Sequence, residues 1–419
     1  MSDLGPLGDG SRVAIIGGGP GGVGCALALR HLAGRLGRHL RITVVEGKQF
    51  AGERHHNLCV GLLSAPLPAL MADCLGLPFP NHLSHAGVAG YVLHTAKEQI
   101  LLEDEQRASV TLRRVQFDDY MLEAARQRGI EILAARAVDV DFHADSVMVY
   151  TESMPIEADV VVGAFGMDDS CIATFTRATR YRPPKYLFSM LANYDPGLAV
   201  IEGLYSYVHA FLPRSPEIEF GAITPKGDYV TINMAGVAVD RPAMQRFLAL
   251  PEVCAVLPAL RGPAFDFDRL PVLKGRFPRS LANHYYGDRY VMVGDAAGLV
   301  RAFKGKGVTS AVQTGIRAAE TMLQRGISSG AFADSYEKAN RDITGDAFYG
   351  SAVRLLVTLS ARFGLIDPVV RAAKHDADVR RGLFGAVSAH EPYRRILEEM
   401  LHYHAVLAVT RAMLPATRS

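Results

Sequence analysis

Asp295 and the glycines around it are the residues whose types and spacing point most directly to chemistry. An apolar run over residues 290–293 predicts a buried strand of a parallel sheet, and Gly294 and Asp295 end it. After Gly305 and Gly307 the apolar residues recur at helical spacing, so we expect a helix that begins with glycine. The first turn of a helix carries unpaired N–H groups and the positive end of the dipole, which favour an anion. Because Asp295 could accept hydrogen bonds from sugar hydroxyls, the stretch predicts a cofactor site; a plain turn of another α/β fold is the alternative.

A second glycine-rich turn stands near the start of the chain. Residues 13–16 predict a buried strand, and residues 23–33 are rich in alanine and leucine and predict a helix. Between them lies the pattern GxGxxG, formed by Gly17, Gly19 and Gly22. Such glycines allow a pyrophosphate to approach the helix N-terminus, and a carboxylate after the next strand can bind ribose hydroxyls. Glu46 follows the predicted strand 41–45 and fits that role, with a solvated strand end as the simpler alternative.

The composition is that of an ordinary globular chain. It has 419 residues, of which 49% are hydrophobic and 21% charged, and its formal net charge of +2 does not suggest nucleic-acid binding. The five cysteines show neither a CxxC pair nor metal-ligand spacing, so we expect no metal site and a reduced, cytoplasmic setting. No signal peptide is visible, and no apolar run reaches the roughly eighteen residues of a membrane span.

The stretch from Gly294 resembles the GD motif of FAD-dependent oxidoreductases in the p-hydroxybenzoate hydroxylase group. Within that group it is most similar to the geranylgeranyl reductase family, whose pattern is close to GDAAGxxxPxxGxGxxxA. The matching positions are Gly294, Asp295, Ala296, Ala297, Gly298, Gly305, Gly307 and Ala311. Ala302 replaces the family's proline, and Lys306 stands where relatives often carry an acidic or polar residue. The resemblance implies FAD as the cofactor, held by the residues of both glycine motifs, Lys306 included.

The resemblance also assigns residues between the two motifs. The family carries a Cys-Gly-rich segment beside the flavin ring, which Cys59 matches loosely, and Arg54 close by would contact the cofactor. A thiol there could give a proton to a substrate carbon, so Cys59 is a catalytic candidate; an inert buried cysteine is the alternative. Arg114 matches the family's RxxFD pattern and is expected near the FAD, unless it is a surface residue at a helix start. Phe165 replaces an aspartate that hydroxylases use, which argues against NADPH binding in their manner.

Three cations precede or enter the glycine-started helix, at Arg301, Lys304 and Lys306. A reduced flavin is an anion, and a helix N-terminus together with a nearby cation would stabilise it. Lys304 is the first candidate for this role and the second catalytic candidate of the chain. The alternative is that all three side chains point to solvent.

Residues 176–284 have the features of a substrate domain. Apolar runs at residues 198–201, 218–223 and 229–234 predict strands separated by turns. Archaeal members of the family line the substrate cavity with a YxWxFP motif, whose nearest counterpart here is residues 208–213. The chain has no tryptophan, so the motif is not intact. The candidate substrate contacts are His209, Phe211 and Pro213, although we favour core packing for Phe211.

These features together predict an α/β fold: a Rossmann-like, three-layer ββα FAD-binding domain, an interrupting mixed β-sheet substrate domain and a helical C-terminal tail. The FAD-binding domain comprises residues 11–85, 103–175 and 285–330. Residues 86–102 and 176–284 form the substrate domain, and residues 331–419 the helical region. Within the first domain a helix is expected to begin at Ser64.

The predicted function is that of an FAD-dependent oxidoreductase of the geranylgeranyl reductase type, which passes hydride from reduced FAD to a carbon–carbon double bond of an apolar, isoprenoid-like or other organic substrate. An FAD-dependent monooxygenase and a flavin-binding protein without turnover are the alternatives. The electron donor stays open between NAD(P)H and a redox protein. We expect no nucleic-acid partner, and peripheral contact with a membrane is compatible with the apolar face of the last helix, although packing on the protein is its default.

Overall fold

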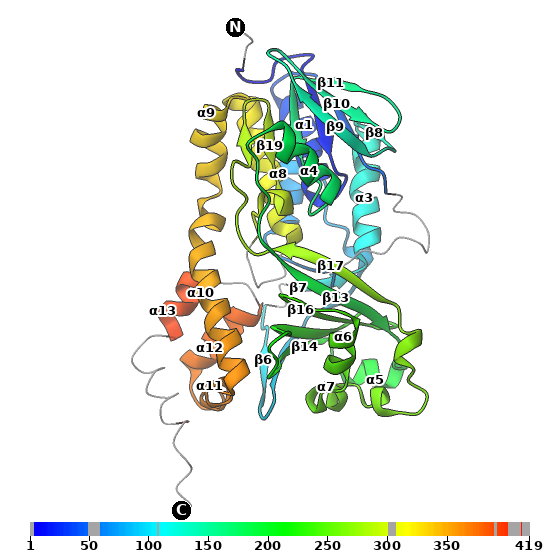
Figure 1. The fold of residues 1–419 in the computed structure, drawn as a ribbon, viewed down its shortest axis with the longest axis vertical. Coiled ribbons are helices and arrows are strands. Elements are labelled where there is room, and N and C mark those ends of the chain that lie inside the picture. The colour runs from blue at the N-terminus through cyan, green and yellow to red at the C-terminus, as the bar shows by residue number, and fades with distance from the viewer. Residues whose placement is uncertain are drawn as a thin grey trace, which may run out of the picture.

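The computed structural model describes residues 4–48, 59–106, 109–300, 307–388, 392–400 and 412. A layered α/β part lies at one end of the molecule, a seven-stranded sheet crosses the other end, and the C-terminal helices run along one side (Figure 1). The predicted α/β fold class, with a mixed sheet and a helical C-terminal region, is confirmed.

The layered part is built on a six-stranded sheet in the order β18–β19–β12–β1–β2–β8, in which β18 alone runs antiparallel to its neighbour. The strands are β1 (Arg12–Ile16), β2 (Arg41–Val45), β8 (Glu131–Leu133), β12 (Val160–Gly163), β18 (Tyr286–Gly287) and β19 (Tyr290–Met292). The central strands β12 and β19, and β1 after Arg12, are apolar because both of their faces are covered. The helical layer consists of α1 (Pro20–Arg35), α3 (Arg114–Gln127) and α8 (Gly307–Gln324). The other face carries an antiparallel meander of β9 (Ala137–Phe142), β10 (Val147–Thr151) and β11 (Ile156–Ala158).

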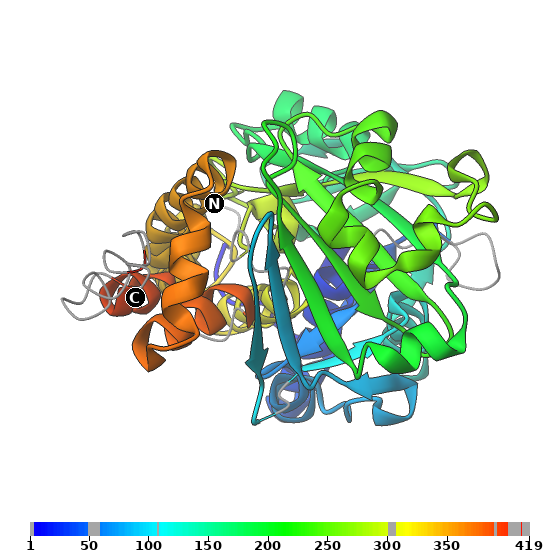
Figure 2. The same cartoon turned by 90° about the horizontal axis from the view of Figure 1, so that it is seen from below.

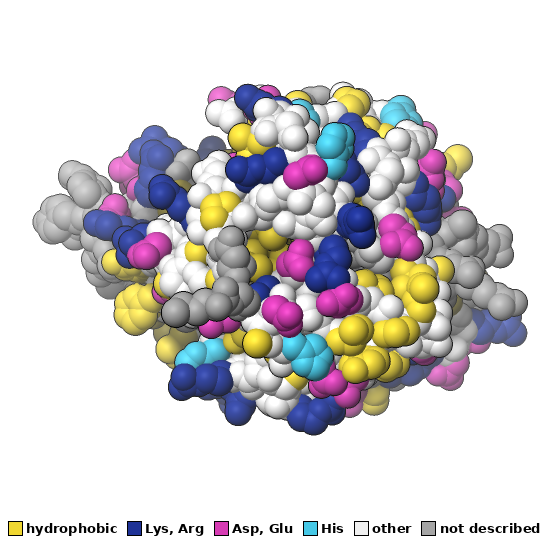
Figure 3. All heavy atoms as spheres, turned by 90° about the horizontal axis from the view of Figure 1, so that it is seen from above, with side chains coloured by type: hydrophobic (Ala, Val, Ile, Leu, Met, Phe, Trp, Pro, Cys, Tyr) yellow, Lys and Arg dark blue, Asp and Glu magenta, His cyan; other side chains and the backbone are white. Residues whose placement is uncertain are grey.

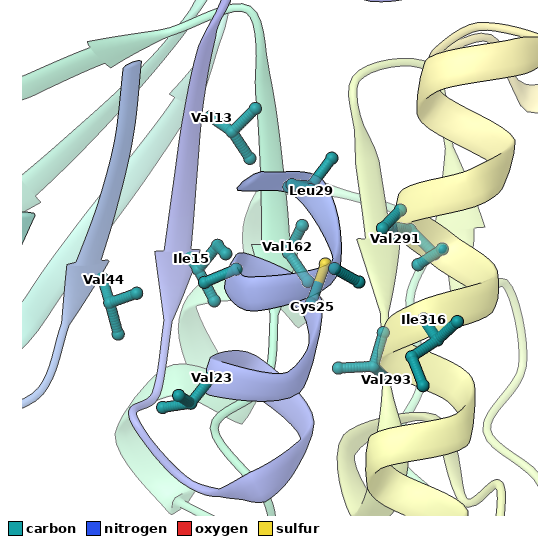
Figure 4. Close-up of a cluster of buried hydrophobic side chains, with 14 of the residues drawn as sticks. Val13, Ile15, Val23, Cys25, Leu29, Val44, Val162, Val291, Val293 and Ile316 are labelled. Atoms are coloured by element: carbon teal, nitrogen blue, oxygen red, sulfur yellow. The ribbon is translucent and has the colours of Figure 1, made fainter. Parts of the chain in front are cut away.

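Helices α1 and α8 pack against each other through glycines. A Cβ placed on Gly315 of α8 would lie 2.5 Å from the carbonyl oxygen of Gly21, so no side chain fits there. On the facing helix, a Cβ on Gly24 would lie 3.3 Å from the Cα of Val312. Around this contact, side chains from both helices and from β1, β2, β12 and β19 form one buried cluster (Figure 4), which includes Ile15, Cys25, Val162, Val291 and Ile316.

The seven-stranded sheet has the order β17–β13–β16–β15–β14–β5–β6, and β14 and β5 are its one parallel pair. Its strands are β5 (Gly90–Thr95), β6 (Gln99–Glu103), β13 (Tyr186–Tyr194), β14 (Tyr207–Leu212), β15 (Phe220–Pro225), β16 (Val230–Gly236) and β17 (Val272–Pro278). The face remote from the layered part is covered by α5 (Leu198–Gly203), α6 (Arg241–Leu248) and α7 (Pro251–Val256) (Figure 1). The sheet therefore turns its other face toward the six-stranded part.

Two local predictions were wrong. Residues 198–201, predicted as a strand, begin helix α5, because a short apolar run does not distinguish a strand from a buried helix. Ser64, predicted to start a helix, ends strand β3 (Leu62–Ser64), and α2 (Leu67–Leu75) begins after it. Strand β3 pairs with β7 (Ser109–Leu112), which also pairs with β4 (Ser84–Gly87). This small sheet joins the two larger parts.

Besides four short 3-10 helices (Asn81–Leu83, Pro258–Arg261, Phe267–Arg269 and Gly294–Ala297), the remaining described elements are helix α4 and the helical region at the end of the chain. They are α4 (Asp169–Ala178), α9 (Ser329–Ala331), a π-helix (Phe332–Glu337), α10 (Arg341–Phe363), α11 (Ile366–Ala373), α12 (Ala377–Ser388) and α13 (Tyr393–Met400). The C-terminal helices lie beside β5 and β6 at the edge of the large sheet (Figure 2). None of the helices that the structure describes has the length and apolarity to cross a bilayer.

The surface combines mixed charge with one apolar helix face. Seen from the end opposite the large sheet, cationic and anionic side chains are interspersed (Figure 3). Helix α10 exposes apolar side chains at helical spacing: Phe348, Leu355, Leu356, Leu359 and Phe363. Peripheral membrane contact was predicted for the apolar face of the last helix, and it stays a prediction because residues 401–411 of that segment lie outside the described residues.

Three ion-pair sites join the C-terminal helices to the large sheet. The buried carboxylate of Asp367 in α11 accepts hydrogen bonds from Thr95 Oγ1 at 2.5 Å and from Arg214 Nη2 at 2.6 Å. The other two sites join Arg354 of α10 to Glu219, with Nε 2.6 Å from Oε2, and Glu98 to Arg371 and Lys374 of α11. Of these, Asp367 is the most buried acceptor and leaves two partners behind when it is removed.

We expect Asp367→Ala to lower the free energy of unfolding by about 2 kcal/mol, because a buried hydrogen bond to a charged group and a half-buried ion pair are both lost. Urea unfolding followed by fluorescence of the tyrosines measures the change. Asp334→Ala, which removes a fully exposed i,i+4 partner of Lys338, is the matched control and should change little. Equal midpoints for Asp367→Ala and the parent would show that this contact does not anchor the helices.

Candidate functional site

The turn between β1 and α1 leaves a helix N-terminus open. Gly17 has φ +111°, and a Cβ there would lie 2.4 Å from the carbonyl oxygen of Ala164 at the end of β12. A Cβ on Gly22 would lie 1.9 Å from Gly17 O, so both positions require glycine. Gly19, the N-cap of α1, offers no side-chain cap, and a Cβ placed on it meets no atom within 4 Å. The N–H groups of this turn are therefore accessible to an anion.

Glu46 lies against the same turn. Its Oε2 accepts a hydrogen bond from Gly18 N–H at 2.8 Å, and its Oε1 accepts one from Lys48 N–H at 2.7 Å. A Cβ on Gly18 would lie 2.8 Å from the Glu46 side chain, so the carboxylate reaches the turn only because glycine stands there. The structure thus brings Glu46 to the GxGxxG turn, and the carboxylate keeps lone pairs for a further donor.

The second glycine turn brings Asp295 to the start of α8. Gly294 has φ +58°, and its N–H donates to Thr314 Oγ1 of α8 at 3.0 Å. A Cβ on Gly307, the first residue of α8, would lie 3.8 Å from Asp295 Oδ1. Burial raises the pKa of Asp295 to about 6, and the positive charge of Arg114 offsets part of that rise. Hydroxyl donors supplied by a ligand would stabilise such a carboxylate.

Arg114 forms a buried, bidentate ion pair at the first turn of α3. Its Nε and Nη2 each donate to a carboxylate oxygen of Asp118 at 3.0 Å. Burial by itself lowers the pKa of Arg114, but the charges of Asp118 and Cys59 outweigh it and raise the pKa. The guanidinium thus interacts with both Asp118 and Cys59, and its field reaches Asp295. The alternative of an exposed surface arginine is excluded.

Lys226 joins this group from the large sheet. It lies in the turn between β15 and β16, yet it is only 2% exposed, and its Nζ donates to Leu112 O at 2.7 Å. Burial chiefly lowers the pKa of Lys226, to about 8; Cys59 acts in the opposite direction and Arg114 in the same one. Cys59, Arg114 and Lys226 therefore meet between the two parts of the molecule.

Phe165 follows β12 directly beside the first glycine turn. Its ring stacks on Phe175 at 5.3 Å between centroids and meets Tyr181 edge-on at 6.3 Å. Its backbone nitrogen would lie 3.0 Å from a Cβ on Gly17. An apolar, packed ring thus stands at the end of β12 beside the first glycine turn.

The three candidate substrate contacts lie on or just after β14. Phe211 is 1% exposed, stacks on His94 at 4.7 Å and meets Phe247 of α6 at 5.7 Å, which supports its interpretation as a core residue. His209 Nδ1 lies 3.0 Å from His94 Nε2, and burial lowers the pKa of His209 to about 4. Pro213 is buried. Contact of His209 or Pro213 with substrate stays a prediction.

Several predicted site residues lie outside the described ranges. They are Arg54, Lys304, Gly305 and Lys306. The hypothesis that Lys304 tunes a reduced flavin therefore stays a prediction.

The sequence-based prediction did not include Asp118 and Lys226 among the site residues around Cys59. The i,i+4 spacing of Arg114 and Asp118 is a signal for their ion pair. Lys226 gave no such signal, because a lysine between proline and glycine at a turn is ordinarily exposed.

The chain resembles known proteins in sequence and in fold. No protein-family model matches the chain. It is 24% identical over 327 residues to the chloroplastic geranylgeranyl diphosphate reductase of Nicotiana tabacum, an alignment that covers 75% of this chain and 66% of that protein. The chain thus spans slightly less than two thirds of that relative.

Solved structures show the same fold. A geranylgeranyl bacteriochlorophyll reductase-like protein from Thermoplasma acidophilum superposes with a TM-score of 0.68 at 16% identity, covering 94% of this chain and 99% of that one. A 2-methyl-3-hydroxypyridine-5-carboxylic acid oxygenase superposes with a TM-score of 0.60 at 15% identity, covering 86% and 93%. The resemblance read from the two glycine motifs is therefore confirmed: the chain is similar in sequence and in fold to geranylgeranyl reductase-like flavoproteins.

Proposed function

We propose that the protein is an FAD-dependent oxidoreductase. The observation that carries this proposal is the packed pair of helices α1 and α8, the first with Gly19 as its N-cap and the second beginning at Gly307, with a carboxylate at the N-terminal end of each. A dinucleotide flavin has an anionic pyrophosphate and two hydroxyl-bearing chains, so it fits one open helix N-terminus and two acceptors.

Each part of the cofactor has a candidate partner. The open first turn of α1 would hold the pyrophosphate, and Glu46 the adenosine ribose. Asp295 would accept from the ribityl chain, with the N-terminus of α8 beside it. When bound, the flavin supplies two-electron redox chemistry. Arg114 contributes a fixed positive charge near that position.

The purified protein should release FAD and not FMN, because Glu46 and the α1 turn have a role only with a dinucleotide. Mass spectrometry of the cofactor released by heat measures this. Gly19→Ala, whose added methyl group meets no protein atom, tests the turn directly, and we expect weaker FAD binding with an unchanged melting temperature of the cofactor-free protein. FMN in the released fraction would refute the dinucleotide assignment.

Affinity for FAD should depend on pH through Asp295. Its pKa of about 6 in the absence of ligand means that the carboxylate is ionised above pH 6 and becomes neutral below it. A ligand whose hydroxyl groups donate hydrogen bonds binds the ionised carboxylate better than the neutral one. The Kd should therefore rise as the pH falls through 6, by up to about tenfold per pH unit. Fluorescence titration at pH 5 to 8 measures the Kd. Asp295→Asn should bind more weakly with a flatter profile; a flat profile in the parent would exclude Asp295 as the acceptor.

The favoured reaction is reduction of a carbon–carbon double bond in an apolar, isoprenoid-like substrate. It rests on the sequence similarity to the plant reductase and on the group formed by Cys59, Arg114 and Lys226, which can deliver a proton in a buried setting. Adding hydride to one carbon requires a proton for the other, and a thiol next to two cations is suited to give it. The packed ring of Phe165 favours an electron donor other than NADPH bound in the hydroxylase manner.

A monooxygenase is the second candidate, because an oxygenase shares the fold. We expect the dithionite-reduced protein to be re-oxidised without oxygen by geranylgeranyl diphosphate, with a product heavier by two hydrogens. Flavin absorbance and product mass measure this. Re-oxidation only after oxygen is admitted, with a product heavier by one oxygen from an aromatic substrate, would favour the monooxygenase. Neither product, with FAD bound, would favour a flavin-binding protein without turnover.

A further inference from the structure

Lys226 is buried at a place where turns are ordinarily exposed. Its backbone N–H donates to Tyr229 O at 2.8 Å and closes the hairpin, while its side chain turns inward to Leu112 O at the end of β7. An ammonium has three donors, and Leu112 O is the one acceptor that the described ranges provide within hydrogen-bond distance. Burying a lysine side chain in this way is costly, so a role for the charge is expected.

The backbone near Cys59 leaves room for the Lys226 side chain because residue 61 is a glycine. Gly61 has φ +69°, and a Cβ there would lie 2.6 Å from Lys226 Nζ and 2.1 Å from Leu112 O. The N–H of Gly61 donates to Cys59 Sγ at 3.3 Å, which turns the sulfur back toward the same glycine. Gly61 thus contacts Lys226 on one side and the Cys59 sulfur on the other.

The charged and titratable groups around Lys226 come from the start of α3, from β4, from the β15–β16 turn and from the segment around Cys59. Arg113 and Arg114, at the start of α3, both disfavour its ammonium form, whereas Cys59 favours it. Arg113 is paired with Asp228 at 3.0 Å and Arg114 with Asp118, so carboxylates offset part of both guanidinium charges. His85 of β4 faces the same group, and its pKa is lowered by burial and by the charges of Arg113 and Lys226.

We propose that Lys226 is a positioning residue for Cys59: its ammonium stabilises the thiolate of Cys59 and returns a proton to it. The inference rests on the proposed double-bond reduction. There the S–H bond of Cys59 breaks as a C–H bond forms at one substrate carbon, and the sulfur keeps the electron pair. A two-electron-reduced flavin, when bound, would supply the hydride that the other carbon needs. An N–H of Lys226 then re-forms the S–H bond, and the neutral amine takes a proton from water.

Alkylation of Cys59 tests the coupling without turnover. The cofactor-free and FAD-loaded proteins are treated with iodoacetamide at pH 6 to 9, and the labelled Cys59 peptide is quantified by mass spectrometry. Because the thiolate is the nucleophile, Lys226→Gln should slow labelling at pH 7.5 by about tenfold, while its amide can still donate to Leu112 O. Lys226→Arg should restore most of the rate, since it restores the charge.

Two controls separate this effect from misfolding. Lys185→Met removes an exposed lysine of the large sheet and should leave the labelling of Cys59 unchanged. Cys74, which is partly exposed in α2, serves as an internal reference whose labelling should be equal in all variants, and Lys226→Met is the second neutral variant if Lys226→Gln does not fold. An unchanged Cys59 profile in a folded neutral variant overturns the inference. A slowed profile in a protein that reduces no double bond would keep the coupling and refute only the reaction.

Discussion

The close packing of α1 on α8 is the constraint on which the candidate site depends. Gly315 approaches the backbone at Gly21 so closely that a methyl group there would overlap a carbonyl oxygen. Interiors transmit such overlaps because they are close-packed, so a side chain at this contact would separate the helices. The two helices begin at the two glycine turns, and their separation sets the distance between the turns. The spacing of the α1 turn from Asp295 therefore depends on the glycines of this helix contact.

The packing of α1 on α8 brings charged groups close together, and buried charges are stable only when they are paired. Two helix N-termini contribute partial positive charge at neighbouring positions, and Glu46 and Asp295 stand against them. Arg114 is held by Asp118 in a bidentate pair, which fixes the guanidinium while it acts on Asp295 and Cys59. The raised pKa of Asp295 shows that its own desolvation outweighs the attraction of Arg114. Asp295 is thus a buried hydrogen-bond acceptor whose ionised form a ligand with hydroxyl donors would stabilise.

The sequence predicted the parts of the site that depend on local backbone geometry. Gly17, Gly22 and Gly294 are required by positive φ or by sub-van-der-Waals approaches within a few residues of the turn, so their spacing is visible in the chain itself. Lys226 and Asp367 could not be predicted, because their burial depends on contacts more than a hundred residues away in sequence. Residues 198–201 were misassigned for a related reason: whether a short apolar run forms a strand or a helix is settled by the surface that it packs on.

The large sheet contributes a buried charge to the group around Cys59. Lys226 lies in the turn of the β15–β16 hairpin and interacts with Leu112 O and with Cys59. Its position therefore depends on where the whole sheet is placed. That sheet contains β5 and β6, which lie in sequence between Cys59 and Arg114, and β5 pairs in parallel with β14. The chain thus crosses from the segment around Cys59 into the sheet and back before α3 begins. Asp367 then fixes α11 to Thr95 at the end of β5, which couples the C-terminal helices to the placement of Lys226 through one continuous sheet.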